Sequence, residues 1–175
     1  MSDGDFGQYN LSSDNSVVQS MYVNCYGLIN YANGVLKYAS ATSTEAYEAR
    51  FLRAYGYYLL TQHFGAVPFV TEYIDNASRN YPRVPLETIY PALISDLTEL
   101  YNSSSLDAQS KHDGHVSKQA VAALLAKINL AAGWDLNTSL SDAQKGTYSI
   151  SGTNYFSEAA SWADKAVSGI NLYEN

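Results

Sequence analysis

The chain has little of what disulfide frameworks, membrane segments and nucleic-acid-binding surfaces require. It holds a single cysteine, Cys25, which excludes an internal disulfide and any Cys-x-x-Cys metal or redox motif. No run of about eighteen apolar residues occurs, so the sequence predicts no membrane-spanning helix. Its 10 basic residues stand against 17 acidic ones, and the resulting net charge of −7 argues against nucleic acid and against docking to anionic lipid.

Signatures of catalysis are also missing. The sequence has no Gly-x-Ser-x-Gly, no Walker-type phosphate loop and no dinucleotide-binding glycine pattern. Most acidic residues lie at expected helix starts and in loops, where the capping of helix N-termini accounts for them. The sequence therefore predicts no catalytic residue, no cofactor and no enzymatic activity.

What the chain does have is tyrosine. There are 16 tyrosines against 5 phenylalanines, in a chain that is 46% hydrophobic and 15% charged, a composition typical of globular proteins. A tyrosine offers a flat apolar face and a hydroxyl, so it suits both packing between helices and stacking on a sugar ring. At 175 residues we expect a single domain spanning 1–175, in which most tyrosines pack between helices.

Apolar residues that recur every three or four positions predict an almost entirely helical chain. The expected helices cover residues 14–39, 44–63, 86–102, 118–132 and 155–168. We expect Asp14 or Ser16 to cap the first, and Gly65 and Gly133 to end the second and the fourth. Pro91 predicts a kink or a restart within the third helix, because proline has no backbone N–H to donate.

Alanines give the last two expected helices faces of small side chains. These faces comprise Ala120, Ala123 and Ala126 in one helix, and Ala159, Ala163 and Ala166 in the other. Small side chains let neighbouring helices approach closely, as they do in tetratricopeptide hairpins. The sequence thus predicts an all-α fold of tetratricopeptide-like helical hairpins joined by long irregular loops.

Four sequence blocks, taken in order, resemble a known family. They are Glu-Ala-Arg-Phe-Leu-Arg-Ala-Tyr at 48–55 with Phe-Gly-Ala-Val-Pro-Phe-Val at 64–70, then Asp-Leu at 96–97, then 118–127, then 159–167. This order is similar to that of the SusD-like (SusD/RagB) family, glycan-binding surface lipoproteins of Bacteroidetes, over nearly everything after Met21. The resemblance implies polysaccharide utilisation: oligosaccharide is bound at the cell surface and delivered to a SusC-like TonB-dependent transporter of the outer membrane.

The same resemblance implies a signal segment and a lipid-accepting cysteine that anchors the protein to the outer membrane. Neither is present in this chain, and the long C-terminal half of the family is missing as well. We therefore expect the chain to be an N-terminal and central fragment of a larger SusD-like lipoprotein, which touches the membrane only through that anchor.

Two segments combine aromatic side chains with amide or carboxylate groups, as sugar recognition requires. One contains Phe6, Tyr9 and Asn10, and the other contains Trp134 at the start of a long polar loop. In SusD-like proteins the ligand face draws on loops near the first segment, so the resemblance supports that region without fixing its residues. Trp134 has the alternative interpretation of a packing residue at a helix end.

Three other groups of residues have structural interpretations. Arg50 and Arg53 suit ion pairs within or between helices better than ligand binding. The segment 111–115 contains His112 and His115, but with His63 as the only further histidine it falls short of a metal site. Alternating oxygen donors at Asp135, Asn137, Ser139 and Asp142 lack the glycine and the final glutamate of a calcium loop.

Two other functions remain open at this point. A helical-repeat adaptor that binds another protein, with no glycan, would show the same helical pattern. An all-α enzyme acting on glycans would need two carboxylates facing each other across a cleft, which the sequence does not reveal.

Overall fold

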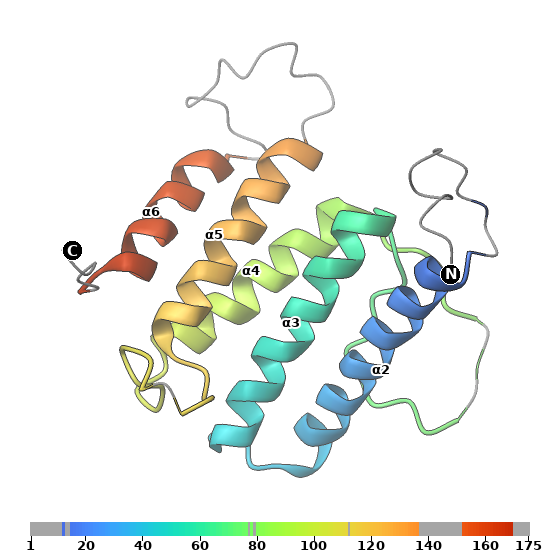
Figure 1. The fold of residues 1–175 in the computed structure, drawn as a ribbon, viewed down its shortest axis with the longest axis horizontal. Helices are drawn as coiled ribbons and strands as arrows, with labels where there is room; N and C mark the ends of the chain where they lie inside the picture. The colour runs from blue at the N-terminus through green and yellow to red at the C-terminus, as the bar shows by residue number, and fades with distance from the viewer. Residues whose placement is uncertain are drawn as a thin grey trace.

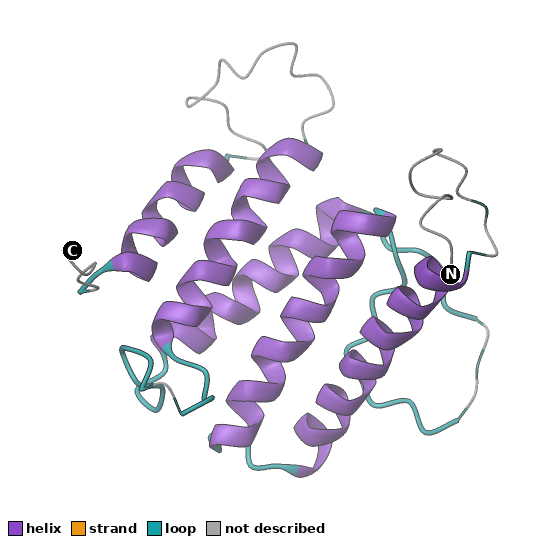
Figure 2. Ribbon diagram, viewed as in Figure 1, coloured by secondary structure: helices purple, strands orange, loops and turns teal. Residues whose placement is uncertain are grey.

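The protein is described by a computed structural model over residues 12, 15–76, 78, 80–111, 113–136 and 152–169. This part of the chain forms five α-helices and no strand, as Figures 1 and 2 show. The helices are α2 (Ser16–Tyr38), α3 (Thr44–Phe64), α4 (Leu86–Asn102), α5 (Lys118–Asp135) and α6 (Tyr155–Val167). The predicted all-α class and all five predicted helices are confirmed.

The helices form an array in which chain neighbours pack against each other. Contacts join α2 to α3, α3 to α4, α4 to α5 and α5 to α6, with one smaller contact between α3 and α5. Consecutive helices run in opposite directions, and α2 and α6 lie at opposite ends of the array (Figure 1). Each helix therefore buries its apolar face mainly against the helices next to it in sequence.

Short polar side chains begin most of the helices. The N-cap residues whose side-chain oxygens accept backbone N–H bonds are Asn15, Ser43, Ser117 and Asn154. The prediction of Asp14 or Ser16 as the first cap is wrong, because the Asn15 amide oxygen takes that role and accepts from Val17 and Val18. All three side chains can cap a helix, so periodicity alone does not choose among them.

Gly65 ends α3, as predicted. Its φ is +66°, in the region that favours glycine, and its N–H donates to the carbonyl of Thr61 over 3.1 Å. The chain can therefore leave the helix and turn at once into the segment that leads to α4.

Gly133 does not end α5, which continues to Asp135. The prediction of a stop is wrong, because glycine at this position allows α5 and α6 to pack closely instead of ending the helix. A Cβ at residue 133 would lie 2.8 Å from Cε1 of Phe156 in α6, a distance that real Cβ contacts do not show. The absent side chain thus lets the Phe156 ring lie against the backbone of α5.

Pro91 lies inside α4, which runs through it without interruption. The predicted restart is therefore wrong. A proline in this second turn removes one helical hydrogen bond, while the apolar face of α4 remains buried on both sides of it. That face comprises Ile89, Tyr90, Leu93, Leu97 and Leu100.

The predicted alanine faces are only partly buried. In α5 the fully buried small residues are Ala122 and Ala132, whereas Ala120, Ala123 and Ala126 are half-buried. In α6, Ala159 is buried, but Ala163 is exposed. Small residues do line the packed faces of both helices, but those faces are rotated from the expected ones.

The connection between α3 and α4, residues 66–85, is held against α2 and α3 by side chains. The hydroxyl of Tyr26 donates to the carbonyl of Pro68 over 2.7 Å, and that of Tyr57 donates to the carbonyl of Val70 over 2.8 Å. Burial raises the pKa of Tyr57 to about 12, so its hydroxyl stays a neutral donor. An antiparallel bridge between Val67 and Val84 closes the base of the connection.

We predict that Gly65→Ala lowers the free energy of unfolding by about 1 kcal/mol, because alanine is strained at positive φ. The matched control is Gly27→Ala inside α2, where the added methyl meets no atom within 4 Å. Alanine there should raise stability by about 0.5–1 kcal/mol through helix propensity. Urea denaturation of the three proteins measures both changes, and equal midpoints for Gly65→Ala and the parent would contradict the stop.

Candidate functional site

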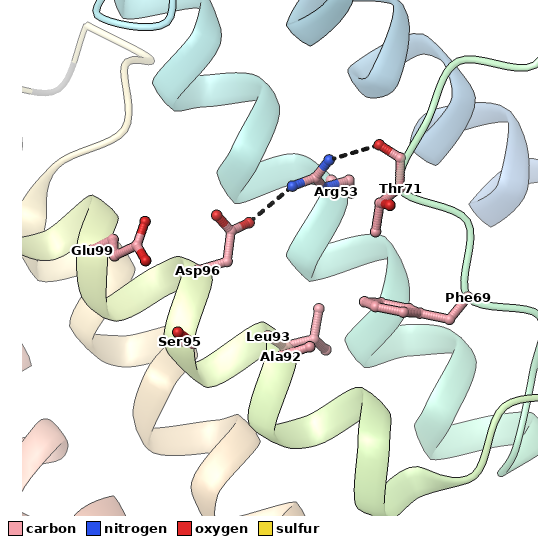
Figure 3. A pocket seen from close by; sticks show the side chains of 8 residues that line it. All are labelled: Arg53, Phe69, Thr71, Ala92, Leu93, Ser95, Asp96 and Glu99. Carbon is pink, nitrogen blue, oxygen red and sulfur yellow. Dashed lines mark hydrogen bonds and ion pairs between the residues drawn. The ribbon is translucent and has the colours of Figure 1, made fainter.

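Arg53 of α3 lies at the junction of three helices. Its guanidinium donates to Asp96 Oδ2 of α4 over 3.1 Å, to Asn33 Oδ1 of α2 over 3.1 Å, and to the carbonyl of Thr71 over 3.2 Å. Figure 3 shows the side chain between Asp96 and Thr71. One cation thus connects α2, α3, α4 and the 66–85 connection.

Arg50, one turn earlier in α3, completes the cluster. Its Nε donates to Asp96 Oδ1 over 2.7 Å, and its other donors reach the Asp96 carbonyl and Glu99 Oε2. The predicted ion pairing of the two arginines is confirmed, and their partners lie on another helix. Because Asp96 is 43 and 46 residues away in sequence, the spacing of charges within α3 could not identify it.

A cavity of about 320 Å³ opens beside this cluster. Its lining residues, drawn in Figure 3, are Arg53, Phe69, Thr71, Ala92, Leu93, Ser95, Asp96 and Glu99. The guanidinium groups and Asp96 already bond each other, whereas the Glu99 side chain is 72% exposed. This cavity offers a carboxylate, a serine hydroxyl and the Phe69 ring to a small polar ligand, a set suited to binding.

The sequence-predicted binding residues fall in two places. Phe6, Tyr9 and Asn10 lie outside the described residues. Trp134 lies near the end of α5 and is 54% exposed. Its ring packs in a T-shaped arrangement with that of Phe156 of α6, with the ring centroids 5.4 Å apart and the planes at 77°. This indole therefore combines a packing contact with substantial exposure to solvent.

The residue after Trp134 is fixed by hydrogen bonds. The carboxylate of Asp135 accepts from the hydroxyl of Tyr90 through a short bond and from Nε2 of Gln62 over 3.5 Å. Burial and this bond raise the pKa of Tyr90, which keeps its hydroxyl a donor. The end of α5 is thereby tied to α3 and α4. The other residues of the calcium-like pattern, 137, 139 and 142, lie outside the described residues.

The histidine segment is anchored to α3. Nδ1 of His115 lies 2.6 Å from Oε1 of Glu48, and the backbone N–H of His115 donates to Asp113 Oδ1 over 3.1 Å. His112 lies outside the described residues. In the part of the chain that the structure describes, no group of three or more His, Cys, Asp or Glu side chains could hold a metal ion. His115 and Glu48 instead link the loop before α5 to α3.

Sequence reasoning missed one aromatic group. Tyr38, the last residue of α2, is 76% exposed, and its ring meets that of Tyr73 in the 66–85 connection. The signal was faint, because Tyr38 fits the end of a helical pattern and Tyr73 lies 35 residues later in a segment without periodicity.

A family model and a curated relative identify the family of this chain. The SusD-like family model, described as "Starch-binding associating with outer membrane", matches residues 3–130. A curated relative, SusD-like protein P2 of Formosa agariphila, is 27% identical over 145 residues, which are 78% of this chain and 28% of that protein.

Solved structures agree in fold. A SusD superfamily protein from Parabacteroides distasonis has a TM-score of 0.74 and 27% identity. The aligned part is 94% of this chain and 34% of that protein. A protein whose crystal structure was determined with xylogluco-oligosaccharide has a TM-score of 0.76 at 22% identity. The aligned part is 97% of this chain and 33% of that protein. The predicted tetratricopeptide-like helical fold is confirmed. The chain spans about a third of the length of the relatives it matches.

None of the described helices has the length and apolar character needed to cross a membrane. The family description speaks of association with the outer membrane, and that is a statement about where its members are found.

We predict that Asp96→Asn lowers the free energy of unfolding by about 2 kcal/mol, because it removes the shared anion of two partly buried arginines. Glu99→Gln is the matched control. Glu99 also forms an ion pair with Arg50, but its side chain is 72% exposed. Loss of this exposed ion pair should lower the free energy of unfolding by less than about 1 kcal/mol. Chemical denaturation of both variants checks the order. Equal losses would show that Asp96 does not join the helices.

We predict a pH dependence of stability through His115. Its hydrogen bond to Glu48, and then the charge of that carboxylate, raise the pKa of His115 above its ordinary value of 6.5. A pKa raised in the folded state stabilises the fold fully below about pH 6.5. This contribution is lost as the pH rises through the raised pKa.

Melting temperatures of the parent and His115→Gln, measured from pH 5 to 9, test this dependence. The parent should be the more stable at low pH, and the difference should shrink as the pH rises. A difference that stays constant across the range would contradict an ionic contact.

Proposed function

We propose that this chain, which belongs to the SusD-like family, binds oligosaccharide without changing it chemically. The observation that carries the proposal is the family match over residues 3–130, whose description is starch-binding. A relative of the same fold has been crystallised with xylogluco-oligosaccharide, which supports a glucose-based oligosaccharide as the class of ligand.

Delivery to a transporter is the second part of the proposal. We place the protein at the outer surface of the outer membrane, held by a lipid anchor on a cysteine outside this chain. There it would pass its ligand to a SusC-like TonB-dependent transporter. The family description of outer-membrane association supports this location. A binding protein anchored beside a transporter raises the concentration of ligand at the transporter entrance.

The ligand residues we propose are Trp134 together with Phe6, Tyr9 and Asn10. The half-exposed indole of Trp134 offers a flat apolar surface, and the ring of Phe156 packs against it. A ring that is fixed before binding loses little conformational entropy when a sugar stacks on it. Tyr9 would supply a second stacking face, and Asn10 would bond hydroxyl groups of the sugar.

Isothermal titration calorimetry with maltoheptaose and a xyloglucan oligosaccharide tests the proposal. The parent should bind at least one of them with micromolar to millimolar affinity, since a shallow platform desolvates little of the ligand. Trp134→Ala and Tyr9→Ala should each weaken binding by about tenfold, which corresponds to the loss of one stacking contact. Tyr31→Ala is the control, because Tyr31 is 78% exposed on α2, a helix that α5 does not contact.

Each other result has a distinct meaning. No heat with any glycan would contradict oligosaccharide binding and favour an adaptor that binds protein. Equal affinities for the parent, Trp134→Ala and Tyr9→Ala would remove both residues from the site. New reducing ends after long incubation with either glycan would contradict a purely binding role.

A further inference from the structure

Two tyrosine rings meet at the C-terminal end of α2. Tyr38 is 76% exposed, and its ring centroid lies 6.5 Å from that of Tyr73, with the planes at 64°. Nζ of Lys37 lies 5.3 Å from the centroid of each ring. Isolated exposed tyrosines are ordinary on protein surfaces, but here two rings and a cation form one cluster. We call Tyr38, Tyr73, Lys37 and Glu72 the tyrosine platform.

The backbone under the platform is fixed. The side-chain amide of Asn30 bonds both the carbonyl and the N–H of Ile74, over 3.2 and 2.8 Å. The buried amide of Asn33 donates to the carbonyls of Val70 and Glu72 over 3.1 and 3.0 Å. Residues 70–74 are therefore held to α2 on both sides of the Tyr73 ring.

The ring of Tyr73 lies close to the helix itself. A Cβ at Gly34 would be 3.2 Å from Cδ2 of Tyr73, which is a tight contact. Glycine at this position lets the ring approach α2, and Tyr38 then meets it from the next turn. A platform arranged in this way before any ligand arrives has a small entropic cost of binding.

A cavity of about 340 Å³ lies beside the rings. Its lining residues are Asn33, Leu36, Lys37, Thr71, Glu72 and Tyr73. The amide nitrogen of Asn33 is engaged with backbone carbonyls, so the charged residues of the lining are Lys37 and Glu72. One supplies hydrogen-bond donors and the other acceptors, which matches sugar hydroxyls because these both donate and accept.

Local charge narrows the class of ligand. Lys37 is the one cation of the cavity lining, and its Nζ lies 3.9 Å from the carboxylate of Asp75. Glu72 adds a second carboxylate, so one positive charge meets two negative ones. The surface therefore repels uronate or sulfate groups and favours uncharged sugars.

We propose that the tyrosine platform is an additional binding site for an uncharged oligosaccharide, separate from Trp134 and from residues 6–10. A sugar ring stacks its C–H face on Tyr38, its hydroxyls donate to the Glu72 carboxylate, and Lys37 donates to a hydroxyl or ring oxygen. This inference rests on the proposed function, since it assigns the same class of ligand to a second binding site.

The two places are far enough apart to act as separate contacts. Tyr38 ends α2 and Trp134 lies near the end of α5, and these helix ends lie at opposite edges of the array (Figure 1). One long glycan chain could occupy both. The second contact would then form at a high effective concentration and slow the release of the polymer.

NMR titration with maltoheptaose tests the platform in protein that carries Trp134→Ala, so that the other proposed site is weakened. Amide shifts should change at residues 33–38 and 71–75. Adding Tyr38→Ala should weaken this binding by about tenfold, and Tyr38→Phe should keep it, because phenylalanine retains the stacking face. Tyr31→Ala is the matched control, an equally exposed tyrosine of the same helix, and should leave the affinity unchanged. A glucuronate-containing oligosaccharide of equal length should bind more weakly than maltoheptaose.

The outcomes separate the two proposals. If the parent binds maltoheptaose but no shifts occur at the platform residues, the platform is overturned and the proposed function stands. If the parent binds no glycan, both are overturned. Stronger binding of the glucuronate oligosaccharide would overturn the uncharged ligand, and equal losses in Tyr38→Ala and Tyr31→Ala would overturn stacking on Tyr38.

Discussion

The shared carboxylate of Asp96 is the contact on which the arrangement of the first three helices depends. It receives two guanidinium groups from α3, and one of these also reaches Asn33 of α2 and the carbonyl of Thr71. Apolar faces alone would let neighbouring helices slide or rotate, because hydrophobic burial has no direction. Partly buried, charge-assisted hydrogen bonds have fixed geometry, so they set the relative position of α2, α3, α4 and the connection between them.

That fixed position matters because two candidate binding surfaces border the segments that these contacts hold in place. Thr71 lines both the cavity of Figure 3 and the cavity beside the tyrosine platform, and both cavities border the 66–85 connection. A long irregular segment is commonly mobile, but here Tyr26, Tyr57 and two asparagine amides replace the missing backbone pairing. The scaffold thus presents its aromatic and carboxylate side chains from a rigid support.

Helix positions followed from the sequence because periodicity and caps are local properties. The stop at Gly65 needed only local backbone geometry, and it was predicted correctly. The stop at Gly133 was not, because the role of that glycine depends on Phe156, which lies 23 positions later. For the same reason Asp96 and Tyr73 could not be paired with Arg53 and Tyr38 in advance. Trp134 could be proposed from composition, but its exposure and its contact with Phe156 needed the fold.

The asparagine amides that bind the 66–85 connection also have a consequence for the order of assembly. Residues 39–43 alone join α2 to α3, whereas Asn30 meets Ile74 across 44 residues. Closing so long a loop costs conformational entropy before the contact contributes any stabilisation. We therefore expect the hairpin of α2 and α3 to form early in folding, and the attachment of the connection to α2 to be among the last steps. The same attachment would then be among the first to open when the native protein fluctuates.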